Sequence, residues 1–81
     1  MAWVTCVQAR PNQRLYVELQ SGRSGEIDLS SDWGTLRELQ NELRNPALFA
    51  QVTVNELGEV IWPNGASLSP EGIERMLAGE R

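Results

Sequence analysis

Five carboxylates are the side chains of this sequence best suited to acid–base chemistry. They are Glu26, Asp28, Asp32, Glu56 and Glu59. Glu26 and Asp28 are two positions apart in an expected strand, so both point to one face, as a general acid and base working together would require. That face is the one in water, because the two acids alternate with Ile27 and Leu29. We therefore favour a charged outer strand face over a catalytic pair.

The residue types give little support to a metal site, an anion-binding loop or a nucleophilic thiol. One cysteine, Cys6, and no histidine exclude a zinc site of the usual ligands and leave the thiol without a base. We expect Cys6 to be a small buried apolar residue. The segment SGRSGE places glycines around Arg23 and could wrap an anion, but a strand follows it, which favours a hairpin turn. We expect no cofactor and no metal.

The composition is that of one ordinary globular domain covering residues 1–81, with 41% hydrophobic and 22% charged residues. Seven basic residues, all arginines, stand against 11 acidic ones, for a net charge of −4. Because the arginines form no run, binding to nucleic acid or to an anionic membrane is disfavoured. The first residues lack the basic and apolar regions of a signal peptide, so we expect a cytoplasmic protein.

The first third of the chain has the composition of strands. Residues 2–9 and 14–20 are rich in β-branched and aromatic types, and the turn residues Pro11 and Asn12 separate them, which predicts a hairpin. In the second arm, apolar and polar residues alternate from position 15 to position 20, so one face of the sheet is covered. A third antiparallel strand is expected over residues 26–29.

From Asp32 the apolar residues recur at helical spacing, at Leu36, Leu39 and Leu43. Asp32 is a suitable N-cap, and Thr35 with Glu38 forms a capping box if the helix begins one turn later. The helix should end at Asn45, because Pro46 disfavours helical backbone in the residue before it.

Three further elements are expected after this helix. Asn45 caps a short helical turn that begins at Pro46 and directs Leu48 and Phe49 inward. Residues 51–62 form a second hairpin around Leu57-Gly58. A last helix follows, with its N-cap at Ser69, Pro70 at its first position, and an end at Gly79. Its apolar stripe consists of Ile73, Met76 and Leu77.

The predicted fold class is therefore α+β. We expect a small antiparallel sheet of about five strands, in the order βββαββ, packed against one main helix, with a short C-terminal helix.

Three tryptophans, Trp3, Trp33 and Trp62, are many for this length, and core packing is the first expectation for each. Trp62 is a candidate partner contact as well, because it lies at a strand end where an indole is commonly half exposed. Pro63, Asn64 and Gly65 describe a tight turn. The candidate partner-binding residues are Trp62, Pro63, Asn64, Gly65, Ile73, Met76 and Leu77.

The segments LYVELQSGRSGEIDL, NPALFAQVTV and GEVIWPNGASLSPE together resemble the short bacterial domain-of-unknown-function family numbered 2442. The resemblance covers Trp3 to about Ile73, and Trp62, Pro63 and Gly65 are its most specific element. It implies a compact α+β domain without an established activity, often encoded beside another short protein in toxin–antitoxin-like pairs. Some longer relatives carry an added DNA-binding helix-turn-helix domain, and we expect none within these 81 residues.

The leading hypothesis is a non-enzymatic interaction module that binds another protein, encoded by a neighbouring gene and acting in an antitoxin-like way. A homodimer is the second partner to consider. The alternative function is a small-ligand or metal-assisted enzyme that uses Glu26, Asp28 and Asp32. A nucleic-acid-associated regulator ranks last, because the net charge is negative.

Overall fold

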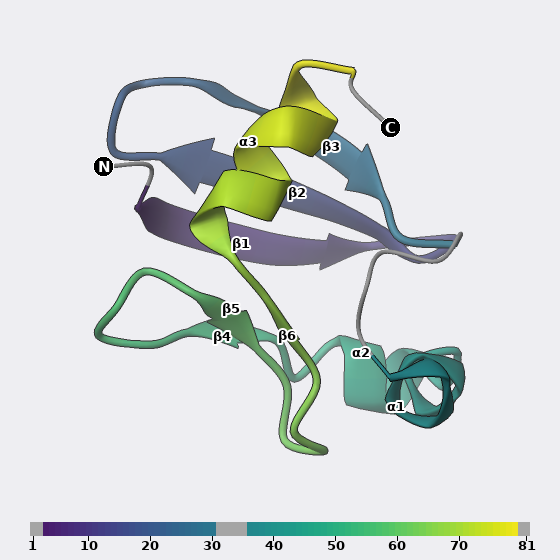
Figure 1. Cartoon of the computed structure of the whole chain (residues 1–81). Coiled ribbons are helices and arrows are strands. Elements are labelled where there is room, and N and C mark those ends of the chain that lie inside the picture. The colour runs from purple at the N-terminus through teal and green to yellow at the C-terminus, as the bar shows by residue number, and fades with distance from the viewer. Residues whose placement is uncertain (1–2, 31–35, 80–81) are drawn as a thin grey trace.

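The computed structural model describes residues 3–30 and 36–79, and it is an α+β fold with two small antiparallel sheets and three helices in this part of the chain (Figure 1). The elements are β1 (Val4–Arg10), β2 (Arg14–Leu19), β3 (Ser24–Asp28), α1 (Arg37–Glu42), α2 (Pro46–Phe49), β4 (Thr53–Val54), β5 (Val60–Ile61), β6 (Ser67–Leu68) and α3 (Pro70–Leu77).

The first sheet has the strand order β1-β2-β3 and confirms the N-terminal hairpin and the third strand. Its β1–β2 turn needs left-handed backbone at Asn12 (φ 64°) and Gln13 (φ 58°), the geometry that matches the twist of paired strands. In β2 the alternation holds, because Leu15 and Val17 are buried while Arg14 and Glu18 are exposed. An irregularity between Val4 and Cys6 shifts the register of β1.

The second sheet has the order β4-β5-β6, with two residues in each strand. The predicted hairpin around Leu57-Gly58 is confirmed, and Gly58 provides the positive φ of its turn (75°). β6 is an additional strand that returns after the turn at Asn64 and Gly65 and pairs with β5.

The expectation of one sheet of about five strands is wrong, because the strands divide into two groups of three. A backbone hydrogen bond of 3.3 Å from the Val4 N–H to the Gly58 carbonyl links β1 to the second hairpin. Gly58 is a turn residue, so the chain reverses there and cannot extend a ladder along β1. The two sheets therefore meet mainly through side chains.

The main helix is shorter than predicted, and it is not the helix that covers the sheet. α1 begins after Leu36, whose side chain makes no capping hydrogen bond and is 71% exposed. The predicted caps at Asp32 and Thr35 lie outside the described residues. Of the three leucines at helical spacing, only Leu43 is buried, and Leu39 is half-buried. The spacing therefore predicted a larger buried helix face than the structure has.

The other two helices begin where their caps predicted. The Asn45 side chain accepts a hydrogen bond from the Ala47 N–H, and the Ser69 hydroxyl accepts one from the Gly72 N–H. α3 is the longest of the described helices, and the strand that it mainly contacts is β3, the outer strand of the first sheet. Figure 1 shows α3 crossing that sheet, with α1 and α2 lying away from it beside the second sheet.

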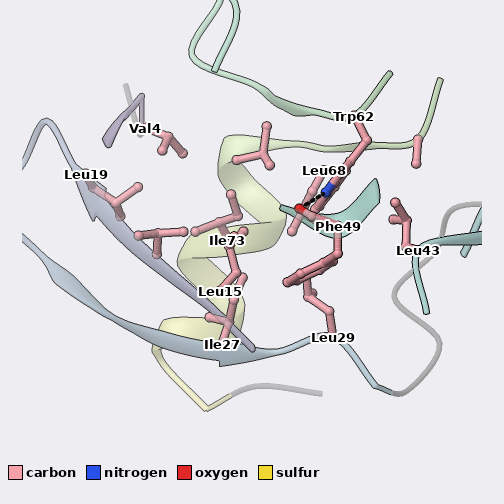
Figure 2. Close-up of a cluster of buried hydrophobic side chains, with 13 residues drawn as sticks. Val4, Leu15, Leu19, Ile27, Leu29, Leu43, Phe49, Trp62, Leu68 and Ile73 are labelled. Atoms are coloured by element: carbon pink, nitrogen blue, oxygen red, sulfur yellow. Dashed lines mark hydrogen bonds between the residues drawn. The ribbon is translucent and has the colours of Figure 1, made fainter. Parts of the chain in front are cut away.

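One core joins these elements (Figure 2). Its buried side chains are Val4, Leu15, Val17, Leu19, Ile27, Leu29, Leu43, Phe49, Val60, Trp62, Ala66, Leu68 and Ile73. Both sheets, α2 and α3 contribute buried side chains, whereas α1 has none within its bounds.

Replacing Gly58 with alanine should destabilise the fold by about 2–4 kcal/mol. The alanine would have to adopt a positive φ, and its Cβ would overlap Trp3. That Cβ would lie 2.9 Å from the Trp3 Cβ and 3.1 Å from its Cα. Gly65→Ala is the matched control, since Gly65 has a φ of 94° and no atom within 4 Å of the added Cβ. Urea unfolding of both variants measures the difference, and equal losses would contradict the Trp3 contact.

Candidate functional site

Trp62 is a core residue with 3% of its surface exposed. Its indole N–H donates a hydrogen bond of 3.1 Å to the Phe49 carbonyl, and its ring stacks on the Phe49 ring with 5.8 Å between centroids. Figure 2 shows this hydrogen bond inside the cluster. The expectation of core packing is met at Trp62, and its indole is not at the surface where a partner could bind it.

The Pro63-Asn64-Gly65 turn fastens the second sheet to α1. The Asn64 amide nitrogen donates to the Leu39 carbonyl at 3.1 Å and to a Glu42 carboxylate oxygen at 2.9 Å. Its amide oxygen accepts from the Ala66 N–H at 3.0 Å, which closes the turn. Pro63 and Gly65 are exposed, while the side chain of Asn64 is engaged in these bonds. The conspicuous Trp-Pro-Asn-Gly element is thus explained by packing and turn formation.

The stripe of α3 faces its own sheet. Ile73 is fully buried, whereas Met76 and Leu77 are half-buried against the core. Leu77 lies directly over the backbone of β3, because a Cβ built on Gly25 would be 3.0 Å from the Leu77 Cδ2 atom. The C-terminal turn of α3 therefore sits on the outer strand of the first sheet.

The outer face of the first sheet carries Glu26 and Asp28, and both are exposed as expected. Glu56 and Glu59 lie in the β4–β5 hairpin instead, where the half-buried Glu59 accepts a hydrogen bond of 3.0 Å from the Asn55 amide. Glu26 lies 3.8 Å from the Arg10 guanidinium and 3.6 Å from that of Arg14. Tyr16 lies beside them, under the Arg10 guanidinium at 5.3 Å, and its hydroxyl donates to Glu18 at 2.8 Å. The hydrogen bond to Glu18 raises the Tyr16 pKa. This face is an ion-paired surface.

Asp28 is held in its ionised form. Hydrogen bonds from Ser30, first from its hydroxyl and then from its backbone N–H at 2.9 Å, lower the Asp28 pKa, and the charge of Arg14 adds to the effect. A lowered pKa suits neither a general acid nor a base poised near neutrality. Asp32 lies outside the described residues. Among those described, no three histidine, cysteine, aspartate or glutamate side chains gather as metal ligands.

The free edge of β3 presents backbone groups that are not used within the first sheet. The Leu19 N–H donates a hydrogen bond to the Arg23 carbonyl, and the Leu29 N–H donates one to the Gln13 carbonyl. These two bonds determine which residue pairs of β2 and β3 exchange hydrogen bonds along the antiparallel ladder. By that alternation, the N–H and C=O groups of Ser24, Glu26 and Asp28 point away from β2. Outside the ladder, no backbone hydrogen bond reaches these three residues from the described part of the chain.

The last turn of α3 lies over β3 beside this edge, where Leu77 packs over Gly25. A strand added about 4.8 Å beyond β3 would lie next to this turn. The backbone edge of Ser24, Glu26 and Asp28, together with Leu77 over Gly25 and its neighbour Met76 in the last turn of α3, is named the β3 edge. It can accept one more strand, with hydrogen bonds along the backbone and apolar contact on one face.

Other surface features are less organised. Trp3 is 38% exposed, against the expectation of core packing, and Leu57 is 65% exposed. Cys6 is half-buried rather than buried, because its strand position belongs to the outer face of the sheet. Trp33 lies outside the described residues.

A shallow groove between the β2–β3 turn and α3 has balanced charges and is lined by Arg23, Glu71, Glu74, Arg75 and Ala78.

Sequence reasoning identified Met76 and Leu77 but missed the backbone groups of β3 beside them. The register of a strand decides which of its residues direct their backbone N–H and C=O groups to the free edge. The register cannot be read from the sequence of one strand. It also missed β6, although Asn64-Gly65 between two short apolar stretches is a strong hairpin signal that could have found it.

Replacing Trp62 with phenylalanine should destabilise the fold by about 2–4 kcal/mol. The change removes the indole donor from the Phe49 carbonyl, which keeps only the 3.3 Å hydrogen bond from the Val52 N–H, and it removes part of the packed indole, while the aromatic stacking partly remains. Chemical denaturation followed by circular dichroism measures the loss. A change below about 0.5 kcal/mol would show that Trp62 is not the buried contact described here.

The Asp28 carboxylate should titrate below its ordinary value of 3.8, as a pH series of NMR spectra would measure directly. Because the folded-state pKa is lowered, the stabilisation is present above the unfolded-state pKa and is lost as the pH falls through the folded-state value. Wild type should therefore exceed Asp28→Asn in stability at pH 7, and the difference should vanish in acid. A difference independent of pH would contradict this assignment.

No helix in the described ranges has the length and apolar character needed to cross a membrane. A family model described as "Protein of unknown function (DUF2442)" matches residues 4–78. Comparisons with curated proteins and with solved structures give no match.

Proposed function

The chain belongs to the DUF2442 family, and from this premise we propose that it is a non-enzymatic interaction module that binds an extended segment of another protein along the β3 edge. The observation that carries the proposal is the set of outward-pointing backbone groups at Ser24, Glu26 and Asp28 beneath the C-terminal turn of α3. Backbone groups in this position add a strand through hydrogen bonds, with little dependence on sequence.

The carboxylates support binding better than catalysis. Glu26 is engaged with two arginines, and the lowered pKa of Asp28 does not suit a general acid or base near neutral pH. The acidic balance of the chain, with a net charge of −4, suits a protein partner more than a nucleic acid. The working hypothesis places the protein in the cytoplasm, with a partner encoded by a neighbouring gene in an antitoxin-like arrangement.

The partner-binding set predicted from sequence changes accordingly. Met76 and Leu77 remain in the proposed surface. Trp62, Ile73 and Asn64 act inside the fold, because two of them are buried and the third is bonded to α1. Pro63 and Gly65 are exposed but belong to the turn that Asn64 closes.

Replacing Glu26 with proline should reduce partner recovery by about tenfold or more, because proline removes an outward N–H donor and its ring blocks the edge. The matched control is Glu26→Ala, which loses the same carboxylate and keeps the N–H group. Tagged wild type and both variants are used to capture proteins from lysate of the source cells, and the bound proteins are quantified by mass spectrometry.

One stoichiometric protein should be retained by wild type and by Glu26→Ala and be lost with Glu26→Pro. Thermal melting of the three proteins verifies that the proline variant is folded. Equal retention by both variants, or no protein above background with wild type, would overturn the proposed function.

A further inference from the structure

We propose that the segment bound along the β3 edge alternates basic and apolar residues, with lysine or arginine on one face and aliphatic side chains on the other. This inference rests on the proposed function above and names the chemistry of the partner.

The basic face follows from the charges that a docked strand would meet first. The side chains of Ser24, Glu26 and Asp28 share the outer face of β3, and the two that are charged are both acidic. The arginines that accompany them, Arg10 and Arg14, belong to β1 and β2 and lie on the side of β3 away from its free edge. Cross-strand neighbours of opposite charge stabilise a pair of strands, and like charges destabilise it.

The apolar face follows from what covers β3 on its other side. Gly25 and Ile27 point inward there, and Leu77 lies over Gly25. Since α3 sits over the outer strand, side chains that point inward from an added strand would lie beneath its C-terminal turn. Aliphatic residues at those positions would add to the burial of Leu77, which is half-buried in the isolated chain.

A second copy of this chain is the less suitable occupant. Antiparallel pairing of two β3 strands over their whole length sets Glu26 against Glu26 of the other copy and Ser24 against Asp28. Glutamates placed directly opposite each other repel, and each copy carries a net charge of −4. Charge complementarity therefore selects a basic partner over self-association.

Three nine-residue peptides test the proposal. In one, lysine alternates with valine; in the second, glutamate alternates with valine; in the third, the lysines and valines of the first are grouped in two blocks. Each is titrated into the 15N-labelled chain, and amide chemical shifts report the site and the affinity. The alternating lysine peptide should shift the amides from Ser24 to Asp28 and bind about three- to tenfold more tightly than either other peptide.

The preference should shrink at high salt, since exposed charge pairs are screened. The double variant Glu26→Lys and Asp28→Lys should reverse it in favour of the glutamate peptide. Glu26→Gln should leave the contact with the valine side chains of the peptide unchanged. It should lower only the preference for the lysine peptide over the glutamate peptide.

The outcomes separate the two proposals. If all three peptides shift the β3 amides with equal affinity, the proposed function stands and the basic, alternating partner is overturned. If none shifts these amides, or if shifts appear only elsewhere, docking on the β3 edge is overturned as well. A dimer of the wild-type chain in sedimentation analysis that disperses in the Glu26→Pro variant would show that a second copy occupies the edge, which also overturns the basic partner.

Discussion

The burial of the Trp62 indole against Phe49 is the contact on which the second half of the fold depends. Strands of two residues cannot hold a sheet together through their own hydrogen bonds, and short helices such as α1 and α2 are not stable alone in water. The indole joins these weak elements, because its ring fills the space between β5 and α2 and its N–H satisfies a buried carbonyl. Asn64 adds a polar link from the same turn to α1.

The parts of the fold that local chemistry determines could be predicted from the sequence. Caps at Asn45 and Ser69, the glycine turn at Gly58, and the alternation in β2 each depend on residues a few positions apart. The division into two sheets could not be predicted, because it depends on which strands pair across long distances. Trp62 shows the same limit for a site: its position at a strand end favoured partial exposure, and packing against a helix 13 residues earlier buried it.

The acidic face of β3 serves two physical purposes that do not conflict. Charged side chains on an outer strand keep identical copies from joining edge to edge, which protects a small sheet from aggregation. In the proposed docking, the same charges would favour a basic strand over an acidic one. Specificity would then arise from side chains, while the backbone groups of β3 would supply hydrogen bonds that depend little on sequence.

The nearly separate backbone ladders of the two sheets have a consequence for how the chain acquires its structure. β1, β2 and β3 are joined by short turns and pair with sequence neighbours, so this meander can form early with little loss of chain entropy. The second sheet has too few hydrogen bonds to precede it and gains stability only on contact with the apolar face already formed. We therefore expect the N-terminal meander to form first and the C-terminal half of the chain to fold against it.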